Sequence, residues 1–584
     1  MQLLASSLAH AQETPRALSG AYSAYEEEAL RAAERELGSP RDEAAEGKPV
    51  EALVIRRLEP IEARDPVPQA LNALHVESRE SVIVREVVLV PGGRFSRALC
   101  DESARRLRTL PQLSLVLCVA VQGSTPGRVK VLILTKDTWS LFLDPDFDTS
   151  GGMLLLEPKE QNLFGLHHAA FVRYWHDPRS YSLGGDYRIP RLDGRFLSLL
   201  IDANVYVNRA TSDLEGSYGA LQAQGVPKST RDPWAWFMDL GWKQQLARSY
   251  RMDVHRAPDD DRARVMDFEW HHRELYGVAA LTRSWGWRYK TDVTAAFLAT
   301  SVSDRRLDEQ RNWADIAAVH VLENQMVVPY RRVGPLIELH LYTTDFLRTF
   351  EVETLGLQED FRLGHDLLLD VNPAWRASEL PGEPVGEFHS LVGASATAQE
   401  TVAWADGFAR IGVQGGADFQ PEETDAAFVK GWLRAVTPRL GFGRLVVDGE
   451  ATLALDDSRF RARPSYGNAN RLRGSVNVTA ASAAVVNLEY RTPALQLWTE
   501  QLGGVLFFDA GRFEQDGGGT IDKSAVGAGL RLVTPVLERS GLRFDLAVPL
   551  DSRGFDVAAL MTQLTFGQAF GLPDVAPLKP RRLK

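Results

Sequence analysis

The feature that most constrains the fold is a series of segments in which apolar and polar residues alternate, from about residue 139 to residue 570. Between residues 447 and 456, for example, Val447 and Leu453 share one parity, and Asp448 and Glu450 share the other. Successive residues of a β-strand point to opposite faces, so this period of two predicts strands with one apolar and one polar face. The pattern recurs in VVNLEYRTP, LFFDAG, VGAGLRLVTP and LRFDLAVPL. This part of the chain is therefore predicted to be mainly β.

Alternation by itself fits two fold classes. In a soluble sandwich the apolar face is the core, whereas in a transmembrane barrel it meets lipid and the polar face lines a wet lumen. Residues 138–570 contain too many strand-like segments for one sandwich. Allotting roughly 27 residues to each strand and its connection gives about 16 tilted strands of about 9 to 11 residues. We therefore predict a transmembrane antiparallel β-barrel, with extracellular loops at residues 213–231, 257–264 and 304–313.

Charge and hydropathy exclude other classes. No run of about 18 apolar residues occurs, so a transmembrane helix is excluded. The net charge of -11 argues against nucleic-acid binding, which needs a concentrated basic face. The chain has none of the HExxH, GxSxG, P-loop or CxxC patterns. We expect no enzymatic activity, no cofactor and no metal site.

The N-terminal 50 residues are predicted to precede the folded domains. Residues 1–11 end in Ala9-His10-Ala11, a small-x-small pattern like that of a signal-peptidase site, with Gln12 as the mature start. The apolar stretch is short and lacks a basic segment, so we expect a longer signal peptide that starts upstream; the alternative is an ordinary N-terminus. Residues 12–50 are rich in acidic residues and helix formers, which predicts a solvated helical tether and linker.

Residues 51–137 have a different pattern, that of a small α/β unit. A strand at ALVIRRL is followed by two helical segments, SVIVREVVL and RFSRALCDESARRLRTL, and then by two strands, LSLVLCVAV and VKVLILT. A unit of this size can fold alone. Both cysteines, Cys100 and Cys118, fall within it. The sequence leaves open a disulfide, which an oxidising compartment would favour, and a pair of buried thiols.

The order of this unit and the following strands resembles a POTRA domain joined to a bacterial surface antigen barrel. This is the architecture of the outer-membrane assembly factor superfamily, which includes BamA-like and TamA-like factors and the two-partner secretion transporters. The resemblance covers about residues 51–570. In that family a loop folds into the lumen with a hydrophobic-Arg-Gly motif, which Leu472, Arg473 and Gly474 match. The family's arginine partner motif is matched by Phe508, Asp509 and Gly511.

The pairing that the resemblance implies is chemically sensible. A loop inside a partly dry lumen must satisfy its charge, and the fork of Arg473 facing the carboxylate of Asp509 gives a strong, directional contact. Gly474 would permit the turn that aims the arginine at the wall.

Two further segments match the family, and the C-terminus departs from it. The early barrel turn is Asn162, Leu163, Phe164 and Gly165, and the terminal strand carries Leu564, Phe566 and Phe570. In the family the terminal aromatic residue ends the chain. Here a basic tail, residues 571–584, follows Phe570, and we expect it in the periplasm or the lumen. One POTRA unit is predicted, fewer than in several family members.

The resemblance implies an outer-membrane protein that inserts or transports protein clients. Clients would be captured by the periplasmic POTRA domain and added at a lateral seam between about residues 139–147 and 557–570. The expected partners are the outer-membrane bilayer, unfolded outer-membrane or secreted clients, and a periplasmic chaperone or accessory lipoprotein. The alternatives are a two-partner-type secretion pore and a structural surface barrel without transport.

Overall fold

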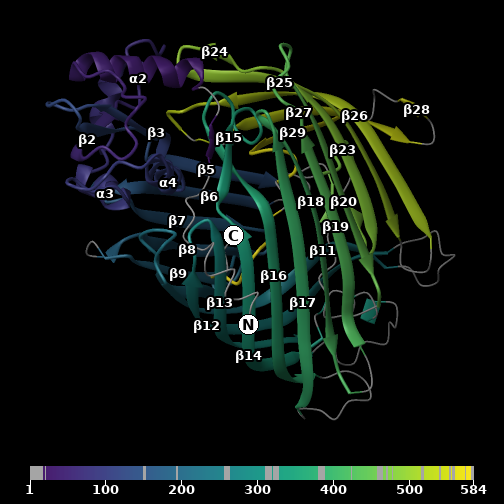
Figure 1. Ribbon diagram of the computed structural model, residues 1–584. Helices are drawn as coiled ribbons and strands as arrows, with labels where there is room; N and C mark the ends of the chain where they lie inside the picture. The colour runs from purple at the N-terminus through teal and green to yellow at the C-terminus, as the bar shows by residue number, and fades with distance from the viewer. Residues whose placement is uncertain are drawn as a thin grey trace.

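The structure is a computed structural model in which a large curved sheet carries a smaller α/β unit at one end (Figure 1). It describes residues 17–19, 22–148, 153–192, 195–254, 264–308, 318–319, 322, 326, 328–378, 388–421, 424–456, 465–467, 471–475, 478–514, 519–537, 539, 541–551, 554–555, 560–571 and 574–580. The predicted signal peptide, residues 1–11, lies outside the described residues, as do residues 257–263 of the second predicted loop and the last four residues of the tail.

The large sheet has 24 strands and is built from consecutive antiparallel neighbours, so the prediction of a mainly β chain is confirmed. Its long strands are β5 (Leu141–Asp148), β6 (Met153–Leu163), β7 (His168–His176), β8 (Ser180–Ile189), β9 (Leu197–Asn208), β10 (Leu214–Gly225), β11 (Trp234–Val254), β12 (Arg264–Trp285), β13 (Tyr289–Arg306), β14 (Tyr330–Thr343), β16 (Glu359–Ser378), β17 (His389–Trp404), β18 (Gly407–Phe419), β19 (Thr424–Val436), β20 (Arg444–Ala454), β23 (Ala483–Arg491), β25 (Glu500–Glu514), β26 (Thr520–Val533), β27 (Leu542–Asp551) and β29 (Met561–Phe566).

Short strands complete the sheet. They are β1 (Ala17–Ser19), β15 (Asp345–Thr349), β24 (Leu495–Leu497) and β28 (Gly554–Phe555), and a separate two-stranded sheet joins β21 (Ser465–Tyr466) to β22 (Val478–Thr479). Among them β1 pairs parallel with β15.

The described part of the sheet contains more long strands than the number, about 16, that was predicted from the length of residues 138–570. The reason is that many connections are short, such as the two-residue turn between β17 and β18, so roughly 27 residues per strand was too generous an allotment. The stretch 213–231 was wrongly predicted as a loop, because β10 occupies most of it. Residues 304–306 likewise belong to β13.

The two faces of the sheet differ as the alternation predicted. In β23, the side chains of Val486 and Leu488 are 45% and 42% exposed, whereas Asn487 and Glu489 between and beside them are buried. The same contrast holds along β20, where large apolar side chains face outward and charged ones face the enclosed side. No helix in the described part of the chain is both long and apolar enough to cross a membrane.

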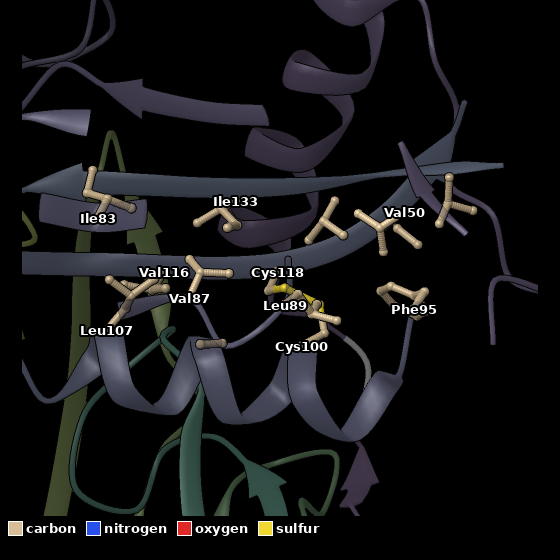
Figure 2. Close-up of a cluster of buried hydrophobic side chains, with 14 of the residues drawn as sticks. Val50, Ile83, Val87, Leu89, Phe95, Cys100, Leu107, Val116, Cys118 and Ile133 are labelled. Carbon is tan, nitrogen blue, oxygen red and sulfur yellow. A yellow bond between two sulfur atoms is a disulfide. The ribbon is translucent and has the colours of Figure 1, made fainter. Parts of the chain in front are cut away.

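The α/β unit contains the predicted elements in the predicted order. They are β2 (Val50–Leu58), α3 (Glu80–Glu86), α4 (Arg97–Arg108), β3 (Leu113–Gln122) and β4 (Val129–Asp137). A 3-10 helix that was not predicted, η1 (Gln69–Leu74), lies between β2 and α3. The sheet order is β2-β4-β3, with β2 parallel and β3 antiparallel to β4. Figure 2 shows the core between this sheet and α4, where a disulfide joins Cys100 to Cys118. Of the two alternatives for the cysteines, a disulfide and a pair of buried thiols, the structure thus contains the disulfide.

Helix α2 (Ala24–Leu37) packs on the other face of this small sheet (Figure 1). It begins with a capping box between Ser23 and Glu26 and ends at Gly38 in the left-handed conformation. A helix was predicted here, but the prediction that it is solvated was wrong. The side chains of Tyr25 and Leu30 are buried against β3 and β4, because the apolar residues of the helix recur on one face.

Candidate functional site

The candidate site is a short segment, residues 471–475, which is part of the connection between β20 and β23 and lies in the interior of the curved sheet. Leu472 and Arg473 are both fully buried. Leu472 packs in an apolar cluster with Tyr466 and Phe513, which fixes the segment against the inner face of β23 and β25. Burying a guanidinium is costly unless it is paired and hydrogen-bonded, so the surroundings of Arg473 decide whether this segment is stable.

The structure brings Arg473 and Asp509 together. The Nε atom of Arg473 donates to Oδ2 of Asp509 at 2.7 Å, and its Nη2 atom donates to Oδ1 at 2.8 Å. The backbone N–H of Arg473 also donates to Oδ2, at 3.1 Å. Two parallel hydrogen bonds between a guanidinium and a carboxylate are strong and fix the orientation of both groups. Asp509 therefore holds the backbone of the segment as well as its side chain.

Glu489 is a second carboxylate partner, which the sequence analysis did not assign. It accepts a hydrogen bond from Nη1 of Arg473 at 2.6 Å and forms an ion pair of 2.6 Å with Arg491. Asp545 lies 3.8 Å from Nη1 of Arg473 and 2.6 Å from Arg531. Arginines thus alternate with carboxylates across β23, β25, β26 and β27, so that each buried charge has an opposite neighbour.

An aromatic ring completes the surroundings of the guanidinium. The ring centroid of Phe507 lies 3.6 Å from the central carbon of the Arg473 guanidinium. The family motif predicted its neighbour Phe508 for this place, but Phe508 is 37% exposed and faces outward. The reason is the period of two along β25, which places Phe507, Asp509 and Gly511 on the inner face. A Cβ at Gly511 would lie 2.6 Å from the ring of Phe513.

Gly474 has the conformation that the turn was predicted to need. Its φ is 75°, in the left-handed region that side-chain-bearing residues avoid. A Cβ at this position would lie 3.0 Å from the Cβ atoms of Ala525 and Ala547. The glycine therefore allows both the turn after Arg473 and close approach of the segment to β26 and β27.

A family model with the description "Omp85 superfamily domain" matches residues 461–570. Residues 461–570, here called the Omp85 domain, are thus similar to an Omp85 superfamily domain. The matched range contains the buried segment together with Glu489, Asp509 and Asp545, the carboxylates that contact Arg473. The geometry around Arg473 is thus the interior of the Omp85 domain.

Solved structures similar to the chain include CdiB from Escherichia coli, at 11% identity and a TM-score of 0.37 over 94% of this chain and 99% of that chain. CdiB from Acinetobacter baumannii has 11% identity and a TM-score of 0.34 over 90% and 74%. BamA from Haemophilus ducreyi lacking POTRA domains 1-3 has 11% identity and a TM-score of 0.29 over 89% and 83%. No curated protein sequence matches the chain.

The early turn predicted from the sequence lies outside the Omp85 domain and docks on the α/β unit. The side-chain amide of Asn162 donates to the carbonyl of Val76 at 2.7 Å, and the carbonyl of Gly165 accepts from the backbone N–H of Arg79 at 2.9 Å. A Cβ at Gly165 would lie 2.4 Å from a backbone oxygen of the unit. Leu163 ends β6, and Phe164 is exposed beside it. The turn is a joint between the two parts of the molecule.

A buried histidine follows the same turn. Its Nε2 atom lies 2.6 Å from the hydroxyl oxygen of Ser78, and its backbone N–H donates to Oδ1 of Asn162 at 3.0 Å. This residue, His167, has its pKa lowered to about 4 by burial, so the imidazole is neutral at physiological pH. These hydrogen bonds of the joint are neutral, and Nε of Arg79 adds a charged donor to the carbonyl of Phe164 at 2.9 Å.

The last strand of the Omp85 domain ends before the aromatic residue that was predicted to terminate it. Strand β29 ends at Phe566, and Leu564 within it is exposed on the outer face. The chain then turns at Gly567, whose φ is 81°, and Phe570 lies buried on the inner side. Its ring centroid is 4.9 Å from the guanidinium carbon of Arg434. Phe570 is therefore an internal anchor rather than part of the strand.

Proposed function

We propose that this protein inserts or transports protein clients at an outer membrane. The observation that carries the proposal is the fully buried segment around Arg473 in the Omp85 domain, held by Asp509 and Glu489 on two strands. Such a segment braces the inner wall on one side of the sheet. A braced wall would let another part of the sheet open while the rest stays folded.

The large sheet acts, in this proposal, as a transmembrane β-barrel. Large apolar side chains on its outward face would meet lipid hydrocarbon, and the charged side chains on its inner face would line the lumen. The backbone N–H of Trp139, just before β5, donates to the carbonyl of Val536 between β26 and β27 at 2.5 Å. This contact brings the start of the first strand to the last hairpins, as closure requires.

The α/β unit, residues 51–137, acts as a POTRA domain in the periplasm. Its β-α-α-β-β order and its position before the sheet support this, and its disulfide suits an oxidising compartment. A periplasmic chaperone or an accessory lipoprotein would dock on this domain and deliver unfolded clients. None of these steps makes or breaks a covalent bond, so the protein would act without a cofactor and not as an enzyme.

Clients would enter the membrane at a lateral seam between β5 and β29. Strand β29 spans 6 residues and β5 spans 8, compared with 22 in β12. Short strands have few ladder hydrogen bonds, so the sheet opens there at the lowest cost. An unpaired strand edge is a template on which another chain can add a strand.

The proposal is tested with the full protein reconstituted in liposomes, by measuring how fast a small unfolded barrel protein folds into them. Wild type should accelerate folding, and Arg473→Ala should lose most of the acceleration. Arg512→Ala, which removes an exposed ion pair with Asp522, should keep it. No acceleration with clear ion conductance would instead indicate a secretion pore with a dedicated partner. Neither activity would indicate a structural barrel.

A further inference from the structure

After β29 the chain passes back through the interior of the sheet. Residues 568–571 and 574–578, here called the internal tail, contact the inner sides of strands far from β29 in the sheet. We propose that this interior contains a seat for an extended polypeptide segment, which the internal tail occupies and which a segment of an unfolded client takes in its place. The inference rests on the proposed function and adds a binding site to it.

The first part of the seat binds backbone atoms. The carbonyl oxygens of Phe570 and Gly571 accept hydrogen bonds from Nη2 of Arg434 at 3.4 and 3.0 Å. The carbonyl of Ala569 accepts from the backbone N–H of Arg471 at 3.1 Å, which links the tail directly to the buried segment. Backbone contacts of this kind are open to any extended chain, because every residue has a carbonyl.

The second part of the seat binds an acidic side chain. Asp574 lies 3.8 Å from Arg362 and 3.8 Å from Arg410, which project from β16 and β18. The side chain of Arg410 is only 2% exposed, whereas that of Asp574 is 60% exposed. The two arginines therefore belong to the wall, and the carboxylate approaches them from the open interior.

The third part of the seat lies across the interior. The backbone N–H of Leu578 donates to Oε2 of Glu338 on β14 at 2.8 Å, and the Leu578 side chain packs near Phe237 and Leu336. The tail thus runs from the end of β29 to the opposite part of the sheet.

The internal tail should exchange more readily than the buried segment around Arg473, because its ion pairs are weaker. Arg473 and its carboxylates are fully buried, so breaking that pair would leave buried charges unpaired and is strongly unfavourable. Ion pairs with exposed groups, such as those of Asp574, contribute little to stability. The buried segment should therefore stay in place while the internal tail leaves, and because Phe570 is itself buried, an incoming chain must supply an aromatic residue in its place. A competing client segment would be extended, with an aromatic residue followed four positions later by an acidic one, as Phe570 and Asp574 are.

The test uses single introduced cysteines in the full protein. The two native cysteines are joined, so Val575→Cys or Ala576→Cys would be the one free thiol in each variant. Val575 is buried and Ala576 is exposed, which makes the adjacent pair a matched control. If the tail is seated, a maleimide should react about tenfold or more slowly with Val575→Cys, because that thiol is reached only after local opening. Equal rates for the two variants would overturn the seated tail.

Competition is then measured with a synthetic peptide that has the sequence of residues 567–580. Added in excess, it should accelerate labelling of Val575→Cys and leave Ala576→Cys unchanged, and a peptide with lysine in place of the Asp574 equivalent should have a much smaller effect. No effect of the first peptide would overturn the exchangeable seat. Labelling requires no client insertion, so a protein that folds clients but does not respond to peptide loses this inference alone. A protein that responds but moves no client loses the proposed function alone.

Discussion

The ring of Phe507 lies against the guanidinium of Arg473, 3.6 Å from its central carbon, while Asp509 two residues later holds the same guanidinium edge-on. One strand, β25, thus supplies both the apolar face and the charged edge that a buried arginine needs. The planar, weakly hydrated guanidinium suits this arrangement, whereas a lysine ammonium offers only a point charge. Strand alternation is what places the two residues on the same side.

Replacing Arg473 should show how much of the stability depends on this geometry. Arg473→Ala leaves Asp509 buried without its arginine, while Glu489 keeps only its ion pair with Arg491, so we expect a loss of about 3–5 kcal/mol in the free energy of unfolding. The unfolding free energy of Arg473→Lys should lie between those of Arg473→Ala and wild type, because lysine keeps the charge but loses the bidentate contact. Unfolding in detergent by denaturant measures both.

The matched control for this pair is Arg512→Ala. Arg512 and Asp522 form an ion pair at 2.7 Å on neighbouring strands of the same domain, but both side chains are more than half exposed. Removing this exposed pair should leave the unfolding free energy close to that of wild type. Equal losses at Arg473 and Arg512 would mean that the buried contacts do not carry the stability.

Gly474→Ala should destabilise the protein without removing any charge. A φ of 75° costs a side-chain-bearing residue roughly 1–2 kcal/mol, and the added Cβ would press on Ala525 and Ala547 at 3.0 Å. Gly441→Ala has no atom within 4 Å of the added Cβ and no left-handed φ, so it should have little effect. The midpoint of thermal unfolding separates the two, and a Gly474→Ala variant as stable as Gly441→Ala would contradict this account of the turn.

Much of the sheet could be predicted from the sequence because alternation depends only on local spacing. In the segment VVNLEYRTP, for example, alternation puts Asn487, Glu489 and Arg491 on one face, opposite the apolar residues. Which of these residues meet could not be predicted, because that depends on the register of two strands, and β23 and β25 pair Asn487 with Asp509 and Glu489 with Phe507. The role of Glu489 was therefore missed although its face was correctly assigned.

The interior contacts were the least predictable part. Helix α2 and the internal tail both interact with residues hundreds of positions away, as when Gln358 donates its backbone N–H to Glu26. Local composition there is acidic or basic, which favours a solvated interpretation. A clue was nevertheless present in α2, since Tyr25, Ala29 and Ala33 recur every four residues on one helix face.

The joint between the α/β unit and the sheet can be loosened by one methyl group. Gly165→Ala would place a Cβ 2.4 Å from the carbonyl oxygen of Glu77, so the turn must move away from the unit. Gly127→Ala introduces the same left-handed strain, at a φ of 82°, but has nothing within 4 Å. We expect faster protease cleavage between the two parts in Gly165→Ala only. If protease cleaves both variants at similar rates, the faster cleavage results from backbone strain and not from displacement of the turn.

The docking of α2 should weaken as the pH rises. Burial raises the pKa of Glu26 to about 7 from its ordinary value of 4.5, so the folded state favours the neutral carboxyl. Its contribution to stability is complete below pH 4.5 and is lost as the pH rises through about 7. The opening constant of the helix should therefore increase by up to about tenfold per pH unit in that window. Hydrogen exchange of the α2 amides, corrected for intrinsic rates, measures it. In Glu26→Gln the opening constant should change little with pH. If it still rises with pH as in wild type, another titrating group causes the pH dependence.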